Sequence, residues 1–238
     1  MSNIAKINGS KNIKHVKQKY STQKECSIAE AVELVKSMSF VKFDQTLELS
    51  VNLGVDPKHS DQVVRGVTRL PHGTGKKIRV AVICKEERAT EAENAGADLF
   101  NVNSIVDEIK SGKINFDVCI ATPDMMGIVG QVAKVLGPRG LMPNPKFGTV
   151  TTDIVSAITD AKNGQIGFRA EKAGIVHAGV GKLSFDTAKL EANCKHLLQA
   201  IVQARPTGAK GTYVKKIHIS GTMTPSVKVG LAALDALN

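Results

Sequence analysis

The residues best suited to catalysis or metal binding in this chain are six histidines and four cysteines, and their spacing favours neither role. The cysteines are Cys26, Cys84, Cys119 and Cys194. No Cys-x-x-Cys pair, His-Glu-x-x-His motif or Gly-x-Ser-x-Gly motif occurs. The sequence therefore predicts a chain that is not an enzyme, with no metal, cofactor or small-molecule substrate. Its thiols are expected to stay reduced in a reducing compartment.

Two glycine-rich segments are similar in composition to ligand-binding loops. Residues 73–76 read Gly-Thr-Gly-Lys, but Leu70 stands where a phosphate-binding loop needs its first glycine. The segment also precedes a predicted strand instead of following one, which argues against nucleotide binding. Residues 137–146 hold three prolines and two glycines, which excludes regular structure. A rigid return loop between domains is favoured there over a direct ligand contact.

Hydroxyl-bearing side chains gather in residues 220–226, directly after a predicted strand. Such a loop can donate hydrogen bonds to phosphates and 2′-hydroxyls, while Met223 can pack on a sugar or base. It can equally be an ordinary turn whose hydroxyls bond their own backbone. Basic residues flank the same predicted sheet and jointly favour a binding surface; they are Lys42, Arg169, Lys172, Lys182, Lys210, Lys215 and Lys216.

The net charge of +10 is unevenly distributed along the 238 residues. It is +3 over residues 1–67, +1 over 68–159 and +6 over 160–238. A surface built jointly by the two ends would produce this asymmetry and would bind a polyanion. Seven Phe, two Tyr and no Trp favour folded RNA over stacked single strands. The lysine-rich residues 1–25 are either a solvated tail or a basic arm that orders on RNA.

Neither end of the chain predicts a complete domain by itself. Ser27 and Glu30 are spaced as a capping box for a helix, and Asp186 begins a second helix. Apolar alternation predicts strands at 47–53, 165–169, 175–180 and 213–220. Together the two ends supply four strands and two helices, enough for one two-layer domain with helices on one face of the sheet.

The middle of the chain alternates strands with helices. Strands are predicted at 78–84, 99–102 and 116–121, and Asp124 is expected to cap a helix that runs to Leu136. This pattern is typical of a parallel α/β sheet covered on both faces. The prediction is an α/β (α+β) chain with a discontinuous domain of residues 1–67 and 160–238. Residues 68–159 form a domain inserted into it.

Several stretches resemble the L-one family of bacterial large-subunit ribosomal proteins, and they span nearly the whole chain. The stretches are 42–46, 61–66, 70–75, 121–124, 136–146, 164–169, 172–182 and 222–223. The run Gly-Pro-Arg-Gly-Leu-Met-Pro-Asn-Pro-Lys is highly specific to that family. The resemblance implies that the split domain binds RNA and that the inserted domain is a Rossmann-like, three-layer α/β unit.

The resemblance also implies the partners. The chain would be a structural constituent of the large ribosomal subunit, and the split domain would bind a folded ribosomal RNA site to form the mobile lateral stalk. The stalk would contact deacylated transfer RNA in the exit site and assist its release. In many bacteria the free protein also represses translation of its own messenger RNA. No apolar run approaches the roughly 20 residues of a membrane span, so a cytoplasmic location without a membrane partner is expected.

The family's RNA contacts map onto Lys42 and Phe43, onto a hairpin with four polar residues, and onto a Thr-Met pair. The hairpin residues are Arg169, Lys172, His177 and Lys182, and the pair is Thr222-Met223. The predicted RNA-binding set is completed by Thr46, Lys210, Lys216 and Ser220.

One departure concerns the residues around the Thr-Met pair. The family usually has Ser or Thr before the pair and glycine after it, whereas this chain has Gly221 and Thr224. If the glycine takes a positive φ, Thr224 would strain the turn, and Gly221 would absorb part of the change.

Two other functions stand as alternatives. A nucleotide- or phosphosugar-handling enzyme would use the middle domain as its Rossmann unit. Against it, residues 85–88 follow the first middle strand without any glycine for a phosphate loop. A free-standing transcript repressor would use the same surface as a ribosomal protein, so only its location, free or ribosome-bound, separates the two.

Overall fold

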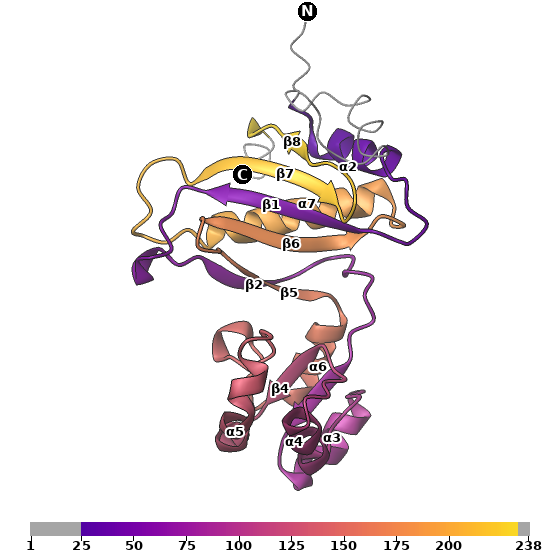
Figure 1. Ribbon diagram of the computed structural model, residues 1–238, viewed down its shortest axis with the longest axis vertical. Coiled ribbons are helices and arrows are strands. Elements are labelled where there is room, and N and C mark those ends of the chain that lie inside the picture. The colour runs from indigo at the N-terminus through magenta and orange to yellow at the C-terminus, as the bar shows by residue number, and fades with distance from the viewer. Residues whose placement is uncertain (1–24, 233–238) are drawn as a thin grey trace, which may run out of the picture. The chain divides into compact units, whose positions relative to one another are not determined.

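The computed structural model describes residues 25–232, so the prediction of a basic arm lies largely outside the described residues. The chain divides into two compact units. In Figure 1 the ribbon is coloured by residue number, so the segments of each unit can be followed along the chain. The first unit comprises both ends of the chain, up to Gly75 and from Gly167, and the second is Lys76–Ile166. The sequence placed the domain boundaries at 67/68 and 159/160.

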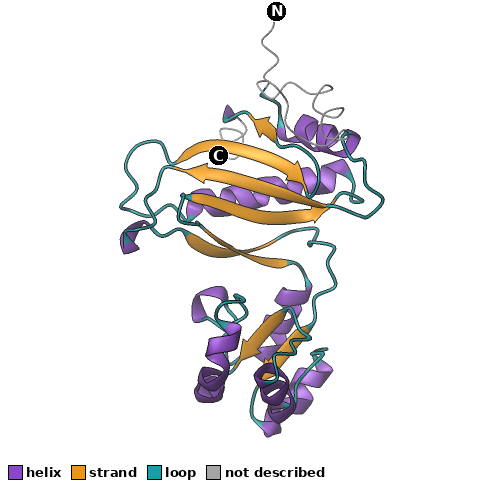
Figure 2. Ribbon diagram, viewed as in Figure 1, coloured by secondary structure: helices purple, strands orange, loops and turns teal. Residues whose placement is uncertain are grey.

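The first unit is built around a four-stranded antiparallel sheet in the order β6-β1-β7-β8 (Figure 2). Its strands are β1 (Thr46–Leu53), β6 (Ile175–Lys182), β7 (Val214–Gly221) and β8 (Val227–Val229). Leu47, Leu49, Val51 and Leu53 of β1 are each at most 2% exposed. Because alternate residues of a strand face opposite sides, this confirms the predicted half-buried strand.

Helices α2 (Ile28–Ser37) and α7 (Thr187–Gln203) pack against each other and against the apolar face of this sheet. Both begin as the sequence predicts. Ser27 Oγ accepts a hydrogen bond from the Glu30 N–H at 3.3 Å, and Glu30 Oε2 accepts one from the Ser27 N–H at 3.1 Å. The Asp186 carboxylate accepts a hydrogen bond from the N–H of Thr187.

The prediction placed one strand in the wrong sheet. Residues 165–169 form β5 (Gln165–Arg169), but β5 pairs with β2 (Arg65–Arg69) in a separate two-stranded sheet. The fourth strand of the main sheet is instead β8, whose three residues are too few to show a pattern. The ring of Phe168 lies where a Cβ on Gly66 would sit, at 2.7 Å. A close contact between residues so far apart in sequence leaves no trace in local periodicity.

The second unit has parallel strands with helices on both faces, as the alternation predicts. Its elements are β3 (Val80–Ile83), α3 (Ala89–Asn94), α4 (Val102–Lys110), β4 (Val118–Ala121), α5 (Met126–Leu136) and α6 (Ile154–Lys162). Ala81 and Ile83 pack with α4 and α5, while Val80 and Val82 pack with α3 and α6. Over residues 25–232 of both units, the short 3-10 turns are Ser60–Gln62, Glu86–Arg88, Pro123–Met125 and Pro145–Phe147.

Two local predictions in this unit are wrong. Asp124 does not cap a helix, because Pro123 opens a 3-10 turn that contains it, and its carboxylate pairs with Lys85 Nζ at 3.3 Å. The strand expected at 99–102 is reduced to a single bridge at Leu99, because Asn101 already caps α4. No helix among residues 25–232 is long and apolar enough to cross a membrane.

Candidate nucleic-acid interface

The residues predicted to bind RNA fall at two ends of the four-stranded sheet. At one end of β1, Thr46 pairs with Lys182 and Leu47 with Gly221. At the other end, Asn52 pairs with Ile175 on β6 and with Lys216 on β7. An eight-residue strand spans about 26 Å at roughly 3.3 Å per residue. The predicted set is therefore two groups of residues rather than one cluster.

We call the first group the Met223 end; it contains Lys42, Phe43, Thr46, Lys182, Ser220, Thr222 and Met223. We call the second group the Lys172 end; it contains Arg169, Lys172, Lys210 and Lys216. His177 lies between them, opposite Ser50 in the middle of β1.

At the Met223 end, the segment that enters β1 is held by residues following β6. Ser184 donates to the Asp44 carboxylate from its N–H at 3.2 Å and from its hydroxyl at 2.8 Å. The N–H of Leu183 donates to the Gln45 carbonyl at 2.8 Å. Between these fixed residues and solvent, the side chain of Phe43 is 53% exposed. The aromatic ring of Phe43 is thus exposed to solvent next to a segment that is held by hydrogen bonds.

The loop after β7 is fixed in the same way. The Thr222 hydroxyl accepts a hydrogen bond from the Thr46 N–H at 3.1 Å and donates to the Thr46 carbonyl at 3.4 Å. The Met223 N–H donates to Gln45 Oε1 at 2.9 Å, yet the Met223 side chain is 47% exposed. The hydroxyl of Thr222 therefore positions the loop, which sequence reasoning did not foresee.

The strain expected at Thr224 is absent. No residue other than glycine has a positive φ anywhere in the described range. Thr224 Oγ1 instead accepts a hydrogen bond from the Gly221 N–H at 2.7 Å. A Cβ at position 221 would lie 3.0 Å from that oxygen and 3.1 Å from Gln45 Oε1. Gly221 and Thr224 thus fit one another, since a Cβ at position 221 would crowd the hydroxyl of Thr224.

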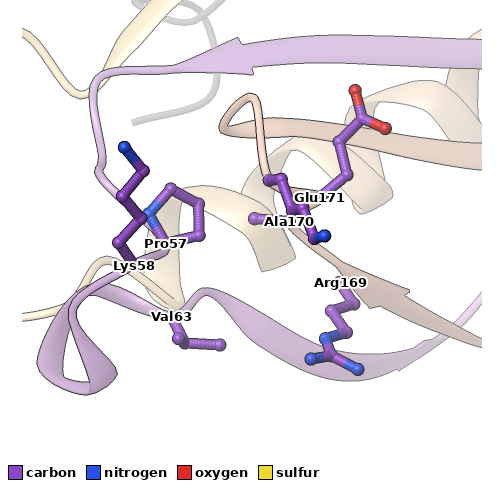
Figure 3. Close-up of a pocket in the computed structure, with 7 residues that line it drawn as sticks. Pro57, Lys58, Val63, Arg169, Ala170 and Glu171 are labelled. Atoms are coloured by element: carbon purple, nitrogen blue, oxygen red, sulfur yellow. The ribbon is translucent and has the colours of Figure 1, made fainter.

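The Lys172 end contains a cavity of about 750 Å³ (Figure 3). One side comes from the segment after β1 and the other from β5 and the turn that follows it. The lining residues are Pro57, Lys58, Val63, Arg169, Ala170, Glu171 and Lys172. Three of these side chains are cationic and one is a carboxylate, that of Glu171, which lies 3.5 Å from His177 Nε2, so the cavity favours an anionic ligand. Lys58 was not predicted, because a single lysine in a loop carries no pattern.

The open face of the sheet is polar between the two ends. Ser50 lies between His177 and His218, and His218 is paired with Lys228 on β8. His177 Nδ1 is 3.0 Å from the Ser50 hydroxyl. Partial burial, with a smaller contribution from the positive charges of Lys216 and Lys228, lowers the pKa of His218 below its usual 6.5. His218 is therefore a neutral hydrogen-bonding group at pH 7.

A cavity in the second unit differs in charge from the one at the Lys172 end. It has a volume of about 260 Å³ and is lined by Cys84, Glu86, Ala89, Phe100, Asn101, Val102 and Asn103, with no cationic side chain. Burial raises the pKa of Cys119 and of Cys194 to about 12, so both thiols are unreactive at neutral pH. Among residues 25–232, no group of three or more His, Cys, Asp or Glu is placed to hold a metal ion.

Comparison with known proteins identifies the family of this chain. A model of the Ribosomal protein L1p/L10e family matches residues 35–225. The protein of Rickettsia bellii (strain OSU 85-389) named large ribosomal subunit protein uL1 is 58% identical to this chain over 229 residues, which cover 96% of each chain. The Rickettsia typhi relative is 57% identical over 231 residues, covering 97% of this chain and 98% of its own. The family consists of non-enzymatic structural proteins, which confirms the prediction that this chain is not an enzyme. This chain belongs to the Ribosomal protein L1p/L10e family.

Proposed function

We propose that this chain is a structural constituent of the large ribosomal subunit, located on the ribosome in the bacterial cytoplasm, and that its first unit binds large-subunit ribosomal RNA. The proposal is carried by one observation, the Met223 end. Phe43 and Met223 expose apolar side chains there on loops held by hydrogen bonds, with Lys42 exposed beside Phe43. Exposed apolar side chains on rigid loops beside a cation suit the sugars and unstacked bases of a folded RNA.

The open face of the sheet supports the same reading. Its outward residues on β1 are Thr46, Glu48, Ser50 and Asn52, and none is large and apolar. Gly179 and Ser220 lie opposite Glu48 on the neighbouring strands, which keeps this part of the face flat. The wide, shallow minor groove of an RNA helix displays 2′-hydroxyls that a flat polar face can contact. Recognition would then be led by shape, with lysines supplying salt-dependent affinity.

A second candidate activity, contact with deacylated transfer RNA in the exit site, is favoured by the Lys172 end. That surface has its own cationic cavity, and the length of β1 separates it from the Met223 end. One chain could then hold ribosomal RNA at one end and a second RNA at the other. Release of transfer RNA from the exit site would follow from movement of the stalk as a whole.

The two units have different roles in this proposal. The first unit is the split RNA-binding domain, and the second is an inserted, Rossmann-like domain that moves with the stalk. Repression of the chain's own messenger RNA would use the Met223 end, since an RNA that mimics the ribosomal site offers the same chemistry. Such an RNA would therefore compete with ribosomal RNA for a single surface.

Binding of the purified chain to a fragment of the large-subunit RNA stalk, against a scrambled hairpin, tests the main proposal. Phe43→Ala is expected to weaken stalk binding about 5- to 150-fold, the equivalent of about 1–3 kcal/mol for loss of an aromatic stacking contact. Met223→Ala is expected to weaken it as well, through loss of apolar contact. Val155→Ala, which removes a 49% exposed apolar side chain from the second unit, is the control and should change nothing. Equal affinity of the unaltered chain for both RNAs would exclude the proposal.

A further inference from the structure

Gln45 is a buried amide at the Met223 end, with its side chain directed between two loops. The residue is 1% exposed, although it lies immediately before β1 and next to exposed residues. Its Nε2 donates to the Ser39 hydroxyl at 2.7 Å, and its Oε1 accepts from the Met223 N–H at 2.9 Å. A buried amide that satisfies its polar atoms on two separate segments holds those segments at a fixed spacing.

The two segments are the ones that carry the exposed apolar side chains. The bond to Ser39 closes the stretch 39–45, which contains Phe43. The bond to the backbone of Met223 fixes the loop after β7. The Gln45 side chain therefore joins the two segments directly, in addition to the bonds between Thr222 and the backbone of Thr46.

We infer that Gln45 is a positioning residue for RNA recognition, an inference that rests on the proposed function. Its amide holds both loops in the binding conformation before RNA arrives. RNA then does not have to order them, and the cost of ordering a flexible loop on binding is avoided. Gln45 itself need not touch RNA, because its side chain is covered by the two loops that it joins.

The contacts of Gln45 are made by the polar end of its side chain. A Cβ on residue 221 would lie 3.1 Å from Oε1, so the glycine there leaves room for the Gln45 side chain. Gln45 supplies a donor to Ser39 and an acceptor to Met223 at once. A methionine of similar length supplies neither. A glutamate keeps the acceptor for Met223, and the Ser39 hydroxyl can rotate to donate to it.

Three variants separate positioning from general stability. Gln45→Met removes both hydrogen bonds, and Gln45→Glu is the conservative variant. Gln62→Met is the matched control, because Gln62 Oε1 also accepts a backbone N–H, that of Asp56 at 2.9 Å, beyond the opposite end of β1. For each, amide hydrogen exchange at Met223 is followed by NMR. The affinity for the stalk RNA fragment is measured over a range of salt at a temperature where all variants are folded.

Gln45→Met is expected to speed exchange of the Met223 amide at least tenfold and to weaken RNA binding about five- to twentyfold. The slope of log affinity against log salt should stay unchanged, because no phosphate contact is lost. Gln45→Glu should retain slow exchange at Met223 and recover part of the affinity. Gln62→Met should leave both quantities as they are in the unaltered chain.

The outcomes distinguish the positioning role from the RNA function. If the unaltered chain prefers the stalk fragment and Gln45→Met binds it equally well, Gln45 is not a positioning residue. Unchanged exchange at Met223 in Gln45→Met leads to the same conclusion. If the unaltered chain does not prefer the stalk fragment at all, the RNA function itself fails and the positioning role fails with it.

Discussion

At the scale of single residues, the hydroxyl and amide groups of the Met223 end act within the protein. Thr222 bonds the backbone of Thr46, and Thr224 bonds the N–H of Gly221. The side chains exposed to a ligand there include the apolar Phe43 and Met223, with the cation of Lys42 beside them. In a loop rich in Ser and Thr, the hydroxyls can therefore hold the backbone rigid and so position the apolar residues. They are then used inside the protein instead of donating hydrogen bonds to phosphates.

His218 provides a prediction about pH at the same scale. Its pKa is lowered in the folded chain, chiefly by burial, so the folded state binds fewer protons than the unfolded state. The contribution that neutral His218 makes to the free energy of unfolding is therefore fully present above pH 6.5. It is lost as the pH falls through the lower pKa of the folded state. His218→Gln stays neutral, so its free energy of unfolding should fall less between pH 7.5 and 5 than that of the unaltered chain.

Urea denaturation at several pH values measures this difference. The control is His59→Gln at an exposed position, which should keep the pH dependence of the unaltered chain. The groups around His218 are Ser50 on β1, Lys216 on β7 and Lys228 on β8. A parallel pH dependence in His218→Gln and the unaltered chain would contradict the assignment.

At the scale of elements, α7 is tied to its surroundings by one buried side chain. Asn193 is fully buried; its Nδ2 donates to the Gly73 carbonyl at 3.0 Å and to the Val180 carbonyl at 2.9 Å. Its Oδ1 accepts from the His72 N–H at 3.1 Å. The helix thus anchors both β6 and the loop that precedes the second unit.

Asn193→Leu would leave those three backbone groups without their partner. Buried unsatisfied groups cost about 1–3 kcal/mol each, partly relieved where water reaches them, so a loss of about 2–4 kcal/mol in the free energy of unfolding is expected. Gln203→Leu, on the exposed end of the same helix, should change that free energy by less than about 0.5 kcal/mol. Chemical denaturation of the two variants compares them, and equal midpoints would rule out the anchoring role.

The elements that could be predicted from sequence are those whose pattern is local. The capping box at Ser27 and the alternation of β1 require only neighbouring residues, and both are confirmed. β8 has three residues, and β2 lacks regular alternation, so neither showed a period. The role of Gln45 and the separation into two ends depend on strand register across more than 100 residues, which no local pattern records.

At the scale of the whole molecule, the separation of the two ends predicts that their partners respond to different charges. The double variant Arg169→Gln/Lys172→Gln should weaken binding of deacylated transfer RNA and lower its salt slope by about 1.5, since each phosphate contact contributes roughly 0.7–0.9. Binding of the ribosomal RNA fragment should keep its affinity and slope. The matched control is Lys110→Gln/Lys113→Gln, two exposed lysines of the second unit.

Salt titrations with both RNAs supply these slopes. An equal loss of affinity for both RNAs in Arg169→Gln/Lys172→Gln would mean that the two ends form one binding surface. An equal loss with the control pair would mean that transfer RNA responds to net charge alone.

The central position of β1 has a mechanical consequence. β1 joins the two ends and is hydrogen-bonded along its length to β6 on one side and to β7 on the other. A pull between partners held at its two ends would load the strand lengthwise, across hydrogen bonds that lie perpendicular to it. Bonds loaded in this way share the force and break together, rather than one after another as in peeling. The sheet would therefore resist extension along β1 and would transmit a displacement from one end to the other with little change in its length.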